Sequence, residues 1–219
     1  MSSTTQTISQ QFLSNLPRGT PPELATAIED AVNDAFGRHG PPAFMQTREA
    51  AIAHECGHGI VGWHEGLIIE SLRIFSRPSP LGNLWGGWCA EKDDKEWRSD
   101  LDTTVESDLS RARMIVAGVA GETVCRLDTP GSSLDEVALS QFISLNATAK
   151  LADPELSQDE YDAYAKQLWH EKVWSVAINI LCANHELFMQ LAERLDRKEK
   201  INGGKLRDML AKIRRLGHE

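Results

Sequence analysis

Apolar residues recur at helical spacing over most of the chain, and the first such pattern lies near the N-terminus. Thr20-Pro21-Pro22-Glu23 combines an N-cap residue, a proline at the first helical position and a capping-box glutamate. We expect residues 1–19 to form a flexible lead and the helix that follows to dock on the main domain, so residues 1–45 are set apart from a domain at 46–219. That helix has its apolar residues on one side: Leu24, Ile28, Val32 and Phe36.

The next segments predict one helix followed by two strands. Gly40-Pro41-Pro42 ends the N-terminal segment, and a helix is expected from about Gln46 to about Trp63. The run Leu67–Phe75 is rich in β-branched and aliphatic residues, and Arg77–Pro80 breaks it. A second extended piece, Leu84–Cys89, then completes a two-stranded β-ribbon.

The remainder of the chain follows a helical pattern. The fold class predicted is therefore mainly α with a small two-stranded β-ribbon. Helices are expected from about Thr103 through Leu127, from Ser133 to about Lys150, over Ser157–His185 and over Glu186–Leu195, with a turn at Ile201-Asn202-Gly203-Gly204 before a last helix that ends near Leu216.

Composition favours one domain in a soluble, reducing setting. The 219 residues are 41% hydrophobic, which is enough for one core, and the net charge of −9 argues against a surface that follows phosphates. The basic runs Arg194–Lys200 and Lys212–Arg215 fit helix C-termini or solvated helix faces, so no nucleic-acid partner is expected. The four cysteines are far apart and form no CxxC pair, which favours free thiols.

No targeting or membrane signal is visible in the chain. Met1–Gln11 is rich in serine, threonine and glutamine and has no apolar segment of the kind found in signal peptides. The longest apolar stretch, around Met114–Gly121, is far shorter than a membrane span. We therefore expect a cytoplasmic protein with no membrane partner.

The sequence His54-Glu55-Cys56-Gly57-His58 carries the candidate chemistry. Four residues advance about 400° on a helix, so His54 and His58 leave the same face and can bind one ion. Glu55 lies about 100° further round, beside the position that a bound water would take. Zinc would lower the pKa of that water to roughly 7, and Glu55 would accept its proton as a general base. The pattern predicts zinc-dependent hydrolysis.

A catalytic zinc usually has three protein ligands, and three residues are candidates for the third. His64 falls at the spacing of the motif HExxHxxGxxH, but Val61 stands where that motif has glycine, and on a continued helix His64 points away from the histidine pair. Glu122, in the small-residue helix Ala117–Glu122, could bind the metal or orient a ligand. Asp135 lies in the first turn of a helix for which Ser133 and Glu136 form a capping box.

Residues 46–216 resemble the peptidase domain of the FtsH-type AAA zinc endopeptidases. The stretch 48–61 looks like the zinc helix of that family, and Leu72–Arg77 followed by Leu81-Gly82 is similar to the strand and turn that line its substrate cleft. Gly118–Glu122 resembles its glycine-alanine-glutamate helix, and Gly131–Asp135 the turn that bears its third ligand. Residues 180–210 resemble its closing helices.

The resemblance implies roles for individual residues. It makes His54, His58 and Asp135 zinc ligands, Glu55 the catalytic base, and Glu122 a carboxylate that orients a ligand. Two departures are visible: no GxxxxGK[ST] loop is present, so neither an ATPase module nor ATP binding is expected, and Leu134 replaces the asparagine that usually precedes the aspartate.

These observations predict an ATP-independent zinc metalloendopeptidase that cuts flexible segments or a dedicated protein partner. A peptide would add as a strand beside the second extended piece, with Leu84, Trp85, Gly86, Gly87 and Trp88 as its binding residues. Two alternatives stay open. One is a catalytically silent zinc module that binds a peptide or a partner protein. The other is a small-molecule hydrolase, which would need a closed pocket instead of an open strand.

Overall fold

A computed structural model describes residues 47–79, 82–92, 104–125 and 133–216, with the backbone alone at Ser79, Gly82 and 133–135. The predicted N-terminal lead and docking helix lie outside the described residues and stay predictions. The described residues belong to one compact unit, Phe44–Glu219.

Helix α3, Arg48–His64, is the central element of this unit. Thr47 caps it by accepting a hydrogen bond from the backbone N–H of Ala50, and Glu49 in the first turn complements the helix dipole. Thirteen of its 17 residues are buried, which requires neighbours on more than one side. The helix that bears the histidine pair is therefore part of the core.

A three-stranded antiparallel sheet covers one side of α3. Strand β1, Ile69–Ser79, lies between β2, Gly82–Glu91, and β3, Lys200–Asn202. The predicted ribbon corresponds to β1 and β2, but the prediction of two strands was wrong. The third strand comes from the segment predicted to be a turn, because left-handed Glu199 (φ 55°) ends the preceding helix and returns the chain to β1.

Strand β1 also continues to Ser79, into the predicted break at Arg77–Pro80, of which Pro80 lies outside the described residues. Pro78 pairs with Asn83 of β2, whereas β3 pairs only with Ser71–Arg73. Proline has no N–H to donate, so it is tolerated here, where β1 has a partner on one side only among the described residues.

The other described elements are helices. The long helix predicted over 157–185 is continuous in direction but contains a π-helical turn, at which Arg113 donates to the backbone oxygen of Lys172 over 3.1 Å. None of the helices within the described residues is long and apolar enough to cross a bilayer. Their bounds are α4 Val105–Val124, α5 Ser133–Leu151, α6 Gln158–Trp169, η2 His170–Trp174, α7 Ser175–Ala183, α8 His185–Lys198 and α9 Gly203–Leu210.

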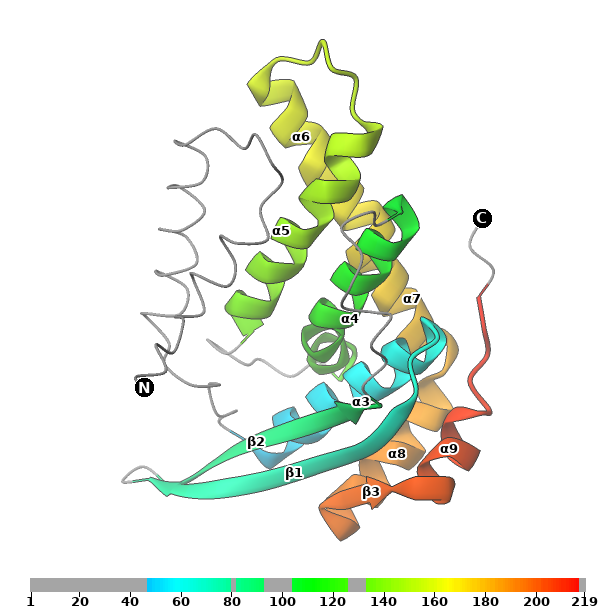
Figure 1. The fold of residues 1–219 in the computed structure, drawn as a ribbon. Coiled ribbons are helices and arrows are strands. Elements are labelled where there is room, and N and C mark those ends of the chain that lie inside the picture. Colours follow the sequence, from blue (N-terminus) through cyan, green and yellow to red (C-terminus); the bar gives the residue numbers. More distant parts are fainter. Residues whose placement is uncertain (1–46, 80–81, 93–103, 126–132, 217–219) are drawn as a thin grey trace, which may run out of the picture. The chain divides into compact units, whose positions relative to one another are not determined.

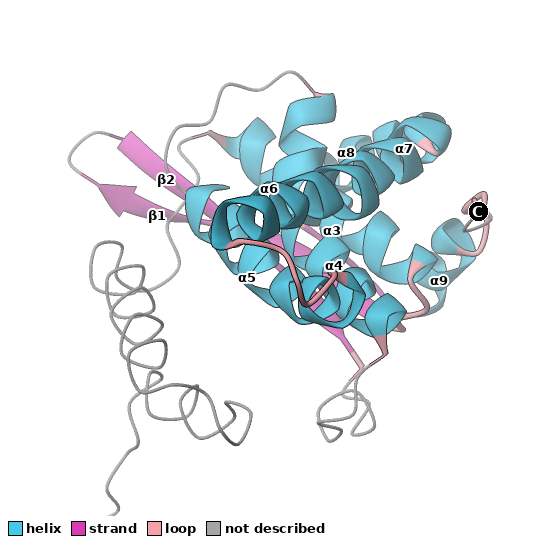
Figure 2. Cartoon of the chain, turned by 90° about the horizontal axis from the view of Figure 1, so that it is seen from above, coloured by secondary structure: helices cyan, strands magenta, loops and turns pink. Residues whose placement is uncertain are grey.

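Helices α3 to α6 lie on one face of the sheet. Seen from above, they lie in front of β1 and β2 (Figure 2), and the side view shows α3 along that same face (Figure 1). The core between these layers contains Ile60, Leu72, Phe188 and Leu206, all fully buried. Helix α3 thus lies between the sheet and the helices α4, α7 and α8.

Two glycines let α3 and α4 approach each other closely. A Cβ atom on Gly57 would lie 2.2 Å from the backbone oxygen of Ala117, and one on Gly121 would lie 2.4 Å from that of Ala53. Both contacts are with backbone, which cannot rotate aside as a side chain can. The crossing therefore excludes any side chain at these two positions.

We expect Gly57→Ala to destabilise the fold by about 1–3 kcal/mol or more, since over-packing a tight core has this cost. Gly204→Ala is the matched control, because a Cβ there meets nothing within 4 Å. Urea unfolding followed by circular dichroism measures both. Equal stability of the two variants would contradict the close crossing of α3 and α4.

Candidate metal centre

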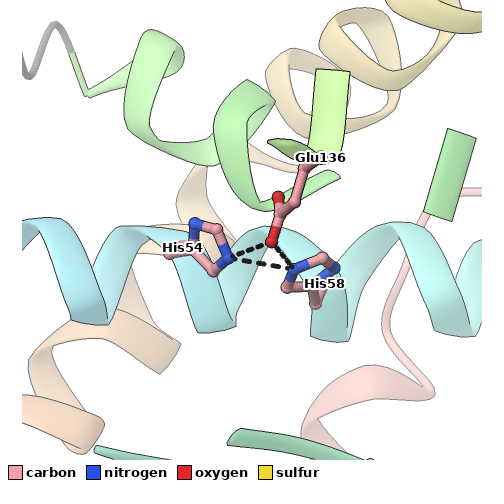
Figure 3. A group of neighbouring side chains, drawn as sticks. All are labelled: His54, His58 and Glu136. Carbon is pink, nitrogen blue, oxygen red and sulfur yellow. Dashed lines mark hydrogen bonds and ion pairs between the residues drawn. The ribbon is translucent and has the colours of Figure 1, made fainter. Parts of the chain in front are cut away.

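His54 and His58 leave the same face of α3 and point their Nε2 atoms at each other. These two nitrogens are 3.1 Å apart, and the rings meet edge to face with centroids 4.8 Å apart (Figure 3). His54 is 4% exposed, and the side chain of His58 is partly open to solvent. The spacing of four residues thus produces the paired imidazoles that the sequence predicts.

A carboxylate from α5 completes the group. Glu136 Oε1 lies 2.9 Å from His54 Nε2 and 3.6 Å from His58 Nε2 (Figure 3). Two ligands of a tetrahedral zinc ion, each about 2.0–2.1 Å from the metal, are roughly 3.3 Å apart. The three separations in this group bracket that value. His54, His58 and Glu136 form the group within the described residues that could hold a metal ion.

When both rings are neutral, as in metal binding, their hydrogen bonds leave both Nε2 atoms without a proton. His58 Nδ1 lies 2.9 Å from the backbone oxygen of Met114, which can only accept, so the proton of the neutral ring is on Nδ1. His54 Nδ1 donates in the same way to Glu122 Oε1 over 2.6 Å. Three lone-pair atoms therefore converge with no donor among them, and such a set fits a cation.

Glu122 of α4 orients His54 from behind the group. Its side chain is fully buried, and its bond to Nδ1 fixes both the tautomer and the plane of the ring. Gly118, one turn earlier on α4, makes room for that ring, since a Cβ there would lie 2.3–2.6 Å from its atoms. The glycine and glutamate that the sequence singled out in this helix thus both contact His54.

The surrounding carboxylates favour positive charge at this position. Burial by itself lowers the pKa of His54, but Glu136 and the hydrogen bond to Glu122 outweigh it and raise that pKa to about 10. Burial by itself raises the pKa of Glu136, and the two histidines reverse this and lower it to about 2. The groups that stabilise a proton on the ring would stabilise a metal ion in the same way.

Two carboxylate oxygens at the site have no hydrogen-bond partner within the described residues. They are Glu136 Oε2 and Glu55 Oε2, both buried. An unpaired buried carboxylate oxygen is costly unless a cation or water meets it. Both oxygens therefore support the fit of a metal ion with bound water.

Glu55 lies at the junction of α3 and the sheet. It is 4% exposed, and a Cβ on Gly87 of β2 would lie 2.3–2.6 Å from its side chain, so the strand passes directly over it. Burial raises the pKa of Glu55, and the charges of His58 and His54 oppose that shift. A carboxylate with a raised pKa is suited to accept and return a proton near neutral pH.

The carboxylate that meets the two histidines is next to the residue named as third ligand in the sequence analysis. The side chain of Asp135 lies outside the described residues, so its ligand role stays a prediction, and the carboxylate that meets the histidines is the adjacent Glu136. The capping-box pattern had assigned Glu136 to the helix end. Neighbouring helix positions point about 100° apart, so sequence alone could not tell which carboxylate faces α3.

His64, the weakest candidate for the third ligand, lies elsewhere. Its Nε2 accepts the backbone N–H of Leu216 over 3.0 Å, and its Nδ1 lies 3.2 Å from Glu65 Oε1. Both bonds involve the C-terminal end of α3, away from the histidine pair. His64 therefore fastens the end of the chain to this helix.

The predicted substrate-binding residues all lie on β2, which is an edge strand within the described part of the sheet. Trp85 and Trp88 are on opposite faces: Trp85 packs near α3 with the Arg48 guanidinium 5.0 Å from its ring centroid, and Trp88 is 63% exposed. Gly86 is buried and Leu84 is half-buried. Gly87 is next to Glu55, since a Cβ added to this glycine would meet the Glu55 side chain.

The chain matches no model of a known protein family and no curated protein.

We expect Glu136→Gln to weaken the binding of added Zn²⁺ by more than about a hundredfold, the upper end of the effect seen when a ligand's own partner is removed. Asp135→Asn is the matched control and should bind zinc as the unaltered chain does. Competition with a chromogenic chelator measures both affinities. Weak zinc binding by Asp135→Asn together with normal binding by Glu136→Gln would identify Asp135 as the third ligand instead.

Proposed function

We propose that the protein is a zinc-dependent metallopeptidase. The observation that carries the proposal is the convergence of His54 Nε2, His58 Nε2 and Glu136 Oε1, with Glu55 beside them and an edge strand passing over Glu55. The resemblance of residues 46–216 to FtsH-type peptidase domains, noted from the sequence, supports the same function. The proposal includes no use of ATP, since no phosphate-binding loop is present in the sequence.

His54, His58 and Glu136 would hold the metal, and Glu122 would keep His54 in the binding tautomer. Zinc supplies a Lewis acid that polarises a carbonyl and lowers the pKa of bound water to roughly 7. Glu55 takes the proton of the attacking water and passes it to the leaving amine. Its burial favours both transfers, because the raised pKa keeps the protonated form within reach.

The substrate would be a peptide in extended form. An edge strand offers backbone N–H and C=O groups to a second chain, and β2 runs beside Glu55 through Gly87. A peptide added to β2 would bring its backbone, whatever its sequence, to the base. Such binding requires an unfolded segment, so flexible regions or one dedicated partner are the expected substrates.

We expect Glu55→Gln to lower cleavage of a fluorescently labelled unfolded protein such as casein by at least about 10²–10⁴-fold, the usual contribution of general-base catalysis. Zinc affinity should stay within a few-fold, because Glu55 is outside the ligand group. Glu49→Gln, exposed on the same helix, is the control and should cut normally. Zinc binding without cleavage by the unaltered chain would favour the peptide-binding module instead.

We expect Gly87→Ala to impair catalysis without loss of metal. The new methyl group would displace the Glu55 side chain, which lies within 2.6 Å of its position. Turnover should fall about tenfold or more, since small misplacement of a catalytic group has large effects. Steady-state kinetics and zinc titration on the same preparation separate the two properties. An unchanged turnover number would argue against Glu55 as the base.

A further inference from the structure

The face of the sheet opposite α3, here called the outer face, has exposed side chains at Arg73, Arg77, Trp88 and Lys200. Along β1, Leu72 and Ile74 point toward α3 and are buried, whereas Arg73 points the other way and is exposed. Helices α4, α5 and α6 lie on the α3 side of β1 and β2 in both views (Figures 1 and 2). The exposed side chains of the outer face are therefore turned away from these helices.

The strand register divides the outer face into an apolar half and a cationic half. Trp88 of β2, Arg73 of β1 and Lys200 of β3 lie in one row across the three strands. Two residues further along β1, Phe75 pairs with Gly86, and the Arg73 guanidinium lies 5.4 Å from the Phe75 ring centroid. Apolar residues thus dominate on β2 and cations on β1 and β3.

Trp88 is the most exposed of the large apolar side chains within the described residues, at 63%. Leaving an indole in water forgoes the stabilisation that its burial would give. Tryptophan and arginine are also the residue types most enriched among those that dominate the energy of protein interfaces. The pair Trp88–Arg73 has the composition of a binding surface.

The charge of this face is opposite to that of the chain. The chain as a whole has a net charge of −9, yet the exposed residues Arg73, Arg77 and Lys200 share this face. Three exposed acids lie at the ends of the strands: Glu70 at the irregular end of β1, Glu91 at the end of β2 and Glu199 before β3. A local positive surface on an acidic protein selects a partner that is itself acidic at the point of contact.

We propose that the outer face is a docking surface for an acidic amphipathic helix of a partner protein. The apolar stripe of the helix packs on Trp88, and its acidic flank meets Arg73 and Lys200. A helix about 10 Å wide spans two to three strands spaced about 4.8 Å apart, and helices are the usual cover of an open sheet face. This surface does not depend on the metal centre.

A helix fits this surface better than other anionic partners do. Single-stranded nucleic acid carries a charge at every nucleotide and is bound by continuous basic grooves, whereas here the cations occupy one half of the face only. An anionic membrane would also meet the repulsion of the remaining acidic surface. The apolar half next to a cationic half matches a helix with leucines on one side and glutamates beside them.

The test measures binding of a fluorescein-labelled helical peptide of about 20 residues, with leucines at heptad spacing and glutamates beside them, long enough to form a helix. The receptor is the full chain with Glu55→Gln, so that the probe is not cut. Fluorescence anisotropy should show saturable binding that weakens as salt is added. A matched peptide with lysine in place of each glutamate should not bind.

The double charge-reversal variant Arg73→Glu, Lys200→Glu should bind the acidic peptide about tenfold more weakly or worse. Lys166→Glu with Lys172→Glu, exposed cations on α6 and η2, is the matched control and should bind normally. Trp88→Ala should also lose about tenfold or more, whereas Met189→Ala, an exposed apolar control at 48%, should not. Circular dichroism verifies that each variant folds.

Three results would overturn the proposal. They are no saturable binding of the acidic peptide, equal binding by the outer-face and control variants, and preference for oligo-dT or for vesicles of phosphatidylserine over the peptide. Because zinc plays no part in the assay, these results are distinguishable from a failure of the proposed peptidase activity.

Discussion

The close approach of α3 to α4 is the constraint on which the rest of the structure depends. Gly57 and Gly121 allow the backbones to meet, and Gly118 leaves room for the His54 ring. With α4 at this distance, Glu122 reaches His54 Nδ1 and the Met114 carbonyl reaches His58 Nδ1. Both histidines are thereby fixed in one tautomer, and their remaining nitrogens face Glu136.

This arrangement buries charge, which a fold tolerates only where partners are present. At the N-terminal half of α3, the histidines and carboxylates of the site partner one another. At its C-terminal end, buried Arg113 contacts Glu65 and Glu106, and Glu65 also contacts His64. Burial by itself raises the pKa of Glu65, but His64 and Arg113 lower it below its ordinary value. Helix α3 is thus fastened to α4 near its middle and at its C-terminal end.

The sheet provides the other wall of the site. Gly87 lets β2 pass directly over Glu55, so the base lies between the paired histidines and an edge strand. Arg48 ties the start of α3 to the C-terminal end of α8 through Asp196 and Glu199, and the backbone oxygen of Glu199 accepts the N–H of Ile74 on β1. These contacts connect the start of α3 to β1, the strand with which β2 pairs.

Much of the local structure follows from the sequence, and what does not follow depends on packing between distant segments. The motif helix, β1 and β2 have clear patterns, and small residues around Glu122 indicated a close helix contact. Strand β3 has three residues, too few for any periodicity. The contact of Glu136 with the histidines could not be predicted, because it depends on how α5 is rotated against a helix some 80 residues earlier.

The most direct test of the account is X-ray absorption at the zinc edge on the full chain, purified without chelators or metal-affinity tags. The account predicts about one zinc per chain with nitrogen and oxygen neighbours only, at about 2.0–2.2 Å, from two imidazoles, a carboxylate and water. Sulfur neighbours at about 2.3 Å would assign the metal to cysteines and contradict the proposed centre. A chain that takes up no zinc, even when zinc is added, would contradict it as well.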